Sequence, residues 1–429
     1  ALPTMAPPVR DDPMSYLVRW FPAFAAALLL SATTSAQPIP QGRLTASNGQ
    51  PANAFGRTLD LDGDVAVIAA STGLFPYVWE RIGGSWQQVT QLDPGESTST
   101  VAYGYSVAVS GSIIAIGAPE SPQAGPRRGS VHIFEKTGGT WTHTAKLTVD
   151  ENQTDDFFGG SVDLSGNRLV IGAEGAHVGA GQVQGAAYVF VKGQSGWAFE
   201  DKLVGADSTT YDNFAQSVAI DGDRIAVGCI GADNGQGSAF YDAGAVYVFE
   251  RSGNDWLQTA KLVAPTLFQN ERLGRKVALS GDTLAAGTPG ARVDNIVRRG
   301  AVDVFERVGG VWQHRSRVVA SDGIAEEGLG QQGLALTPER LYVGNSGHFV
   351  DGQGMGSVYS YQRDAGGQWI QNSRFEAYDG VPGQSFGIWV GASGSTVMVG
   401  ASTHDASRGA VYLMFDGMIF KDGFEAIAP

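Results

Sequence analysis

One pattern of residues recurs seven times along this chain, and this repetition constrains the fold more than any other feature. Each copy reads Phe-Gly-x-Ser-Val-x-Leu-Ser-Gly-Asp/Asn-x-Leu-x-Val-Gly-Ala, a variable loop, Gly-Ala-Val-Tyr-Val-Phe, a glycine turn, then Trp and Lys-Leu. The copies follow one another at intervals of 48 to 59 residues, and they begin at Phe55, Tyr103, Phe158, Phe214, Leu273, Leu329 and Phe386. Such a period is typical of repeat architectures rather than of several unrelated domains.

Each copy contains four short runs in which apolar residues alternate with polar or small ones. In the fourth copy these runs are residues 217–220, 224–229, 245–249 and 256–262, and glycine-rich turns bound them. Alternation between tight turns predicts antiparallel strands. We therefore expect an all-β fold, a seven-bladed β-propeller of four-stranded blades, with an open β-solenoid as the alternative. The recurring tryptophans are expected to fill the space between neighbouring sheets: Trp86, Trp141, Trp197, Trp256, Trp312 and Trp369.

The two ends of the repeat array complement each other. The seventh copy stops after its third run, residues 410–415, and lacks the following Trp and Lys-Leu. Residues 42–46, Gly-Arg-Leu-Thr-Ala, resemble the endings of fourth runs such as Lys146-Leu147-Thr148. We expect this N-terminal segment to complete the last blade and to close the ring into one cooperative domain.

The regions outside the repeats suggest a secreted protein. Residues 14–36 read as a signal peptide, with Arg19, an apolar run at 21–30 and small residues before Gln37. We assign residues 1–13 to a disordered upstream extension, 41–417 to the propeller and 418–429 to a C-terminal tail. The expected location is extracellular or on the cell surface, with the periplasm as an alternative, and no membrane span is expected because the apolar run is too short.

Composition narrows the range of partners and chemistries. The formal net charge of −14 opposes binding to nucleic acid. Cys229 is the only cysteine, so an intramolecular disulfide is excluded, and its strand position predicts a buried small hydrophobe. The six histidines have no zinc-site spacing. We expect no metal, no cofactor, no catalytic residues and a monomeric protein.

The repeat resembles the FG-GAP repeat of integrin α-subunit heads and of secreted bacterial proteins. Its name-giving elements are visible as Phe158-Gly159 with Gly172-Ala173 and as Phe386-Gly387 with Gly400-Ala401. The resemblance implies a seven-bladed propeller that serves adhesion or ligand recognition. Calcium-binding members carry an oxygen-rich loop between the first and second strands, but here the segment is as short as Ser165-Gly166-Asn167. We interpret these segments as two-residue hairpin turns, too short to surround a calcium ion.

Loop lengths separate the two faces of the expected propeller. Turns after the first and third strands are short, whereas long loops follow the second and fourth, so a ligand is expected on the long-loop face. Candidate ligand-binding residues on this face are two basic pairs and one polar loop: Arg127 with Arg128, Arg298 with Arg299, and Asp233, Tyr241 and Asp242. The alternative for the polar loop is solvation, and the alternative for the basic pairs is that they balance neighbouring acids such as Asp294 and Glu120.

Three functions remain open from the sequence. The first is a non-enzymatic recognition or adhesion module that binds an extracellular protein or glycan. The second is a carbohydrate-active hydrolase, which would need a pair of carboxylates converging in the central channel. The third is a passive structural surface protein.

Overall fold

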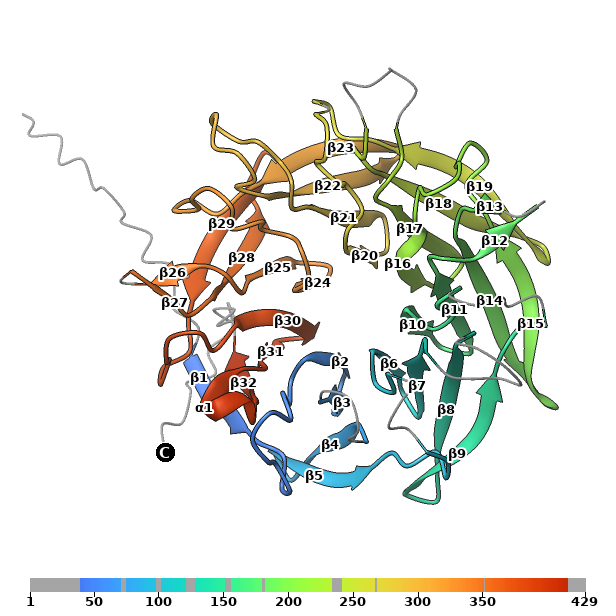
Figure 1. The fold of residues 1–429 in the computed structure, drawn as a ribbon, viewed down its shortest axis with the longest axis vertical. Helices are drawn as coiled ribbons and strands as arrows, with labels where there is room; N and C mark the ends of the chain where they lie inside the picture. The colour runs from blue at the N-terminus through green and yellow to red at the C-terminus, as the bar shows by residue number, and fades with distance from the viewer. Residues whose placement is uncertain are drawn as a thin grey trace, which may run out of the picture. The chain divides into compact units, whose positions relative to one another are not determined.

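Seven four-stranded sheets are arranged around a central axis (Figure 1). The computed structural model describes residues 39–70, 75–97, 102–120, 128–150, 156–179, 182–233, 241–266, 268–350 and 352–415. The upstream extension, the signal peptide and the C-terminal tail proposed from the sequence lie outside these residues. Among the described residues, no helix is long and apolar enough to cross a membrane.

Each blade is an antiparallel meander whose first strand lies nearest the axis. Numbered from blade 1 to blade 7, the inner strands are β2 (Thr58–Asp62), β6 (Ser106–Ser110), β10 (Ser161–Ser165), β16 (Phe214–Asp221), β20 (Val277–Ser280), β24 (Leu334–Leu336) and β30 (Phe386–Ser393). Each inner strand contacts the inner strand of the next blade, and β30 contacts β2, so the ring is closed.

The other strands follow outward in the same order. The second strands are β3 (Val65–Ala69), β7 (Ile113–Ala118), β11 (Arg168–Ala173), β17 (Arg224–Cys229), β21 (Thr283–Thr288), β25 (Arg340–Asn345) and β31 (Thr396–Ala401). The third strands are β4 (Tyr77–Ile82), β8 (Ser130–Thr137), β14 (Ala186–Gly193), β18 (Ala245–Ser252), β22 (Ala301–Val308), β28 (Ser357–Arg363) and β32 (Ala410–Phe415). The outer strands are β5 (Ser85–Gln91), β9 (Thr140–Leu147), β15 (Gly196–Leu203), β19 (Asp255–Leu262), β23 (Val311–Val318), β29 (Trp369–Phe375) and β1 (Ile39–Leu44).

The N-terminal strand completes the last blade, which confirms the expected closure. Strand β1 pairs antiparallel with β32, from Ile39 opposite Phe415 to Leu44 opposite Val411. The side chain of Arg43 forms an ion pair with Asp379, and the hydroxyl of Tyr412 donates to the other oxygen of Asp379 at 2.6 Å. The closure therefore uses side chains as well as backbone hydrogen bonds.

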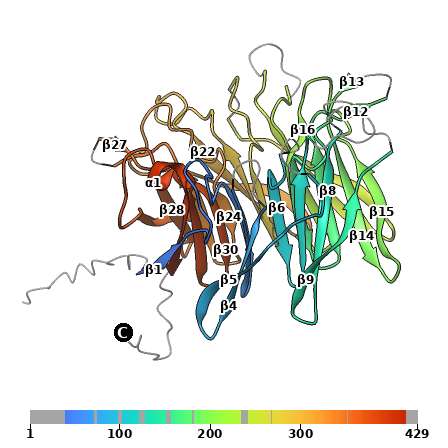
Figure 2. The same ribbon diagram turned by 60° about the horizontal axis from the view of Figure 1, so that its bottom comes forward.

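The two faces of the ring differ in loop length, as Figure 2 shows. On the short-turn face, two-residue turns such as Gly63-Asp64 join inner and second strands. Their glycine amides donate to the preceding blade, for example Gly111 N to Asp62 Oδ2 at 2.7 Å and Gly222 N to Ser165 Oγ at 3.0 Å. These oxygens are thus used in joining blades. The long-loop face carries the hairpins β12 (His177–Val178) with β13 (Gln182–Val183) and β26 (Phe349–Val350) with β27 (Gln353–Gly354), and the short turn α1 (His404–Ser407).

The core consists of apolar walls between adjacent blades. One wall combines Val170 and Val189 of blade 3 with Phe214, Tyr247 and Trp256 of blade 4. The recurrent tryptophans pack in these walls, as the sequence predicted, and several donate their indole N–H to a glutamate of the preceding blade. Trp141 Nε1 lies 2.8 Å from Glu80 Oε1, and the same carboxylate accepts from Lys136 Nζ at 2.7 Å.

A second polar contact joins blades on the side of the long loops. Asp207, in the loop that leaves blade 3, accepts from the Tyr247 hydroxyl and from Lys261 Nζ of blade 4, each at 2.7 Å. The group of Arg43, Asp379 and Tyr412 repeats this arrangement at the closure. In blade 2 a histidine, His132, takes the tyrosine position, beside Glu96 and Lys146.

The entry into each inner strand has an unusual backbone that recurs around the ring. The residue directly before the Phe-Gly position has a positive φ, as at Ala54 (50°), Ala102 (52°) and Arg272 (59°). The residue three positions before it often does too, as at Ala52 (68°) and Asn270 (63°). Residues other than glycine rarely adopt this conformation. Its recurrence with different side chains shows that it belongs to the repeat itself.

Candidate functional site

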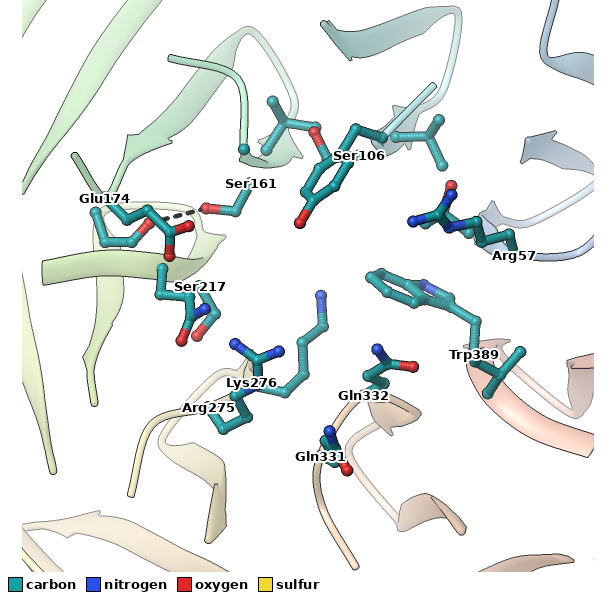
Figure 3. Close-up of a pocket in the computed structure, with 18 residues that line it drawn as sticks. Arg57, Ser106, Ser161, Glu174, Ser217, Arg275, Lys276, Gln331, Gln332 and Trp389 are labelled. Atoms are coloured by element: carbon teal, nitrogen blue, oxygen red, sulfur yellow. Dashed lines mark hydrogen bonds between the residues drawn. The ribbon is translucent and has the colours of Figure 1, made fainter. Parts of the chain in front are cut away.

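The residues that follow each Phe-Gly position meet at the mouth of the central channel. Equivalent positions lie at one level because the seven inner strands share one orientation, and the mouth forms a cavity of about 150 Å³ on the long-loop face. Figure 3 shows the side chains that point into this cavity, including Arg57, Lys276 and Trp389. Arg57 and Arg275 occupy the variable position of the repeat, and Ser106, Ser161 and Ser217 occupy the serine position.

Blade 1 carries Thr58 at the serine position of the repeat, and three blades carry no hydroxyl residue there. They carry Lys276, Gln332 and Trp389 instead. Lys276 Nζ lies 4.3 Å from the centroid of the Trp389 ring, a cation–π contact. These substitutions make the mouth polar and asymmetric where the repeat alone would line it with small hydroxyls.

Deeper in the channel, Lys276 lies near two carboxylates. Burial raises the pKa of Asp163 to about 7, with a further contribution from the charge of Asp60. Burial also raises the pKa of Asp60 and lowers that of Lys276. Protein surrounds all three side chains, but each keeps part of its surface open to the channel.

Both channel carboxylates also connect inner strands. Asp60 Oδ2 accepts from the amide of Val109 in the next blade, and Asp163 Oδ2 accepts from Ile220, each at 2.7 Å. The structure therefore places two carboxylates in the channel, and it uses one oxygen of each to hold neighbouring blades together.

A larger groove crosses the long-loop face over blades 4 to 6. It has a volume of about 1170 Å³, and it shares Gln216, Arg275 and Gln331 with the mouth of the channel. Its walls are the loops that enter β16, β20 and β24 and the loops between the second and third strands of blades 4 and 5. Backbone hydrogen bonds join these loops, including Arg272 N to Asp242 O at 3.0 Å and Gly328 N to Arg298 O at 3.1 Å.

The groove gathers arginines that form no ion pair within the described ranges. Elsewhere in the described part of the chain, most lysines and arginines form ion pairs, such as Arg251 with Glu200 and Arg307 with Glu250. Within the same residues, Arg272, Arg275 and Arg292 line the groove without an ion pair. The fourth groove arginine, Arg298, pairs with Glu326 at 2.9 Å. Arg275 also attracts the carboxylate of Glu174 at the mouth of the channel, so the groove offers, in an acidic protein, guanidinium groups that no ion pair with the described residues holds.

The structure places the residues proposed from the sequence in different environments. Asp242 and Arg298 line the groove, and Tyr241 beside Asp242 is 49% exposed. Asp233 is exposed and accepts the amide of Asp242 at 3.3 Å. Arg299 is buried instead, and its guanidinium donates to Asp294 and to the carbonyl of Ala320 at 2.7 Å. Arg128 is partly buried outside the groove, and Arg127 lies outside the described residues.

Sequence reasoning did not single out the groove arginines Arg272, Arg275 and Arg292 or the channel pair Lys276 and Trp389. A signal for three of these residues was present, because Arg275 occupies the variable position after Phe-Gly and Lys276 and Trp389 replace the serine of the repeat. Arg272 and Arg292 lie in variable loops, where no pattern marks them.

Cys229 and two histidines outside the groove are accounted for by their contacts within the fold. Cys229 is fully buried, as expected, and burial raises the pKa of its thiol. His348 Nδ1 lies 2.8 Å from Glu327, and His177 Nδ1 lies 2.9 Å from Asp156, each joining a long loop to the entry of an inner strand. In the described ranges, no group of three or more histidine, cysteine or acidic side chains is arranged to hold a metal ion.

Comparison with protein families agrees with the repeat pattern. The FG-GAP repeat matches residues 86–134, 141–190, 197–249, 256–305 and 369–415, more than half of the chain. Each match begins in the outer strand of one blade and ends in the third strand of the next, and the first three strands of the first and sixth copies, which begin at Phe55 and Leu329, lie outside the matches. No curated protein matches the sequence. The seven blades and these repeat matches show that the chain belongs to the FG-GAP repeat family.

Proposed function

We propose that this protein is a non-enzymatic extracellular recognition module that binds a protein or glycan through its long-loop face. The observation that carries the proposal is the groove of about 1170 Å³ across blades 4 to 6. A rigid ring positions its loops, and backbone hydrogen bonds preorganise them. Preorganised loops lose less entropy when a ligand binds.

The family supports the same function. FG-GAP repeats are typical of extracellular proteins, and propellers of this family are generally non-enzymatic and consistent with protein binding. Secretion through the segment at residues 14–36 is part of the proposal. The hydrolytic alternative would rest on Asp60 and Asp163, but the backbone hydrogen bonds that these carboxylates accept favour a structural role.

A binding screen tests the proposal. The full chain is presented to a glycan array and to extracellular proteins, in calcium and in a chelator. We expect saturable binding whose affinity changes in a Tyr241→Ala/Asp242→Ala variant, because Asp242 lines the groove and Tyr241 is its exposed neighbour. The control is Asp64→Ala, at an exposed turn on the opposite face.

The outcomes separate the three functions. Binding that persists unchanged in the double variant contradicts recognition through this face, and absence of any binding favours a passive structural protein. Loss of binding in the chelator would instead indicate a required cation, contrary to our expectation.

A further inference from the structure

We propose that the groove over blades 4 to 6 binds an anionic polysaccharide, a chain of pyranose rings that carry carboxylates or sulfates. The inference rests on the proposed function, because it names the ligand class of the same face. It is carried by the charge of the groove, by the comparison of its residues with their equivalents in other blades, and by its exposed rings and amides.

The groove concentrates positive charge in an acidic protein. The chain has a net charge of −14, yet Arg272, Arg275 and Arg292 gather in one groove without ion pairs among the described residues. A guanidinium group presents a planar fork of donors that fits a carboxylate or a sulfate. Screening limits these charges to a range of about 8 Å at physiological salt, so a ligand inside the groove interacts mainly with them.

The fold does not require Arg272 or Arg275. The backbone position of Arg272 recurs in blades 1 and 2 as Ala54 and Ala102, with nearly the same positive φ. The position of Arg275 is filled by Gln216 and Gln331 in neighbouring blades. The same backbone therefore forms with small or neutral side chains, so folding of blade 5 does not depend on Arg272 or Arg275.

The groove also carries exposed aromatic rings and amide side chains. Tyr211 is 74% exposed and Phe268 is 49% exposed. The amide side chains of Asn213, Gln269 and Asn270 lie along the same groove. Aromatic faces stack against the C–H faces of sugar rings, and amides donate to and accept from hydroxyl groups. Together with the arginines, these groups suit a charged saccharide.

An acidic peptide fits the groove less well. Extended peptides are commonly held through free backbone groups at a strand edge. Here the backbone amides of Asn270 and Arg272 already donate to the carbonyls of Tyr241 and Asp242, at 2.9 and 3.0 Å. The groove therefore presents side chains rather than free backbone groups to a ligand, which favours a polysaccharide over an acidic peptide.

The remaining surface limits the shape of the ligand. The excess of acidic residues elsewhere repels a broad polyanion. A narrow chain that lies within the groove avoids this repulsion. Because the groove shares Arg275 with the mouth of the channel, an end of the chain can also approach Arg57 and Lys276 there.

The test measures the affinity of the full chain for defined polymers by titration calorimetry. The probes are polygalacturonate, dextran sulfate, neutral dextran and poly-L-glutamate. The test variant is Arg272→Ala/Arg275→Gln, whose new residues are those of equivalent positions in other blades. The control is Arg81→Gln/Arg224→Gln, which changes the net charge equally on the short-turn face. We expect the test variant to bind polygalacturonate or dextran sulfate at least 30-fold more weakly, and the control at most threefold.

We also expect wild-type binding to weaken as salt increases, and the test variant to unfold at the same temperature as the wild type. The polymer that binds more tightly identifies carboxylate or sulfate as the preferred group. Equal losses in the two variants would overturn the inference in favour of non-specific attraction. Tighter binding of poly-L-glutamate would replace the polysaccharide with an acidic peptide. If neither anionic polysaccharide binds while a ligand from the screen still does, this inference fails and the proposed function stands.

Discussion

Among the described residues, cationic side chains form ion pairs in the walls between blades, whereas three arginines in the groove over blades 4 to 6 do not. In the walls, cations meet carboxylates of neighbouring blades, as Lys136 meets Glu80 and Lys261 meets Asp207. In the groove, Arg272, Arg275 and Arg292 form no ion pair within the described structure. The same repeat thus satisfies its own polar groups where blades pack, and leaves them available where loops enclose a cavity.

This difference suggests a division of roles. Substitutions in the walls should change stability, and substitutions in the groove should change binding while the ring remains stable.

Removal of the closing strand should have the largest effect. Deletion of residues 37–48 removes β1, the buried Leu44 and the ion pair of Arg43 with Asp379. We expect a loss on the order of 5 kcal/mol in the free energy of unfolding, from lost burial and hydrogen bonds. Denaturant unfolding measures it. Arg81→Ala, which removes an exposed pair with Asp64, is the control and should change stability little. An unchanged midpoint after the deletion would show that β1 does not hold the ring.

A wall glycine should be far less tolerant than a loop glycine. A Cβ at Gly228 would lie 2.0 Å from the carbonyl oxygen of Gly274 in the next blade, whereas one at Gly354 would have no atom within 4 Å. We expect Gly228→Ala to destabilise the protein by about 3 kcal/mol through overpacking. Gly354→Ala should be close to neutral. Equal urea midpoints for the two variants would mean that the blades separate easily, contrary to the tight approach described here.

Acid should destabilise one wall through His132. This side chain is 1% exposed, and burial together with Lys146 lowers its pKa to about 4, with His143 and Glu96 as its other titratable neighbours. The ordinary pKa of histidine is about 6.5, so the unfolded chain binds more protons between these values. This contribution to stability, up to about 3 kcal/mol, is therefore present above pH 6.5 and lost as the pH falls toward 4.

The variant His132→Tyr restores the residue that the repeat carries at this position, as Tyr247 does in blade 4. We expect its free energy of unfolding to fall less than that of the wild type between pH 7 and 4, while affinity for the groove ligand stays unchanged. Parallel stability profiles for the two proteins would show that His132 is not the acid-sensitive group.

Much of the fold followed from the repeat, because each blade carries its own turns and strands. The two-residue turns, the tryptophan positions and the closure by residues near Arg43 all correspond to short-range patterns. The groove was harder to predict. Whether an arginine is free depends on partners about 50 to 60 residues away in another blade, as for Arg251 and Glu200. Arg298 and Arg299 show the limit most clearly, since adjacent residues of one type point to the groove and to the interior.

The closure also sets an order of events during synthesis. Ile39 and Phe415 are paired neighbours, so β1 leaves the ribosome long before its partner exists. At 5 to 20 residues per second this wait lasts roughly 20 to 75 s. During that time β1 has no partner strand, and Pro40, which has no backbone N–H, weakens any pairing with foreign strands. The strand that closes the ring is therefore also the strand that waits longest for its partner during synthesis.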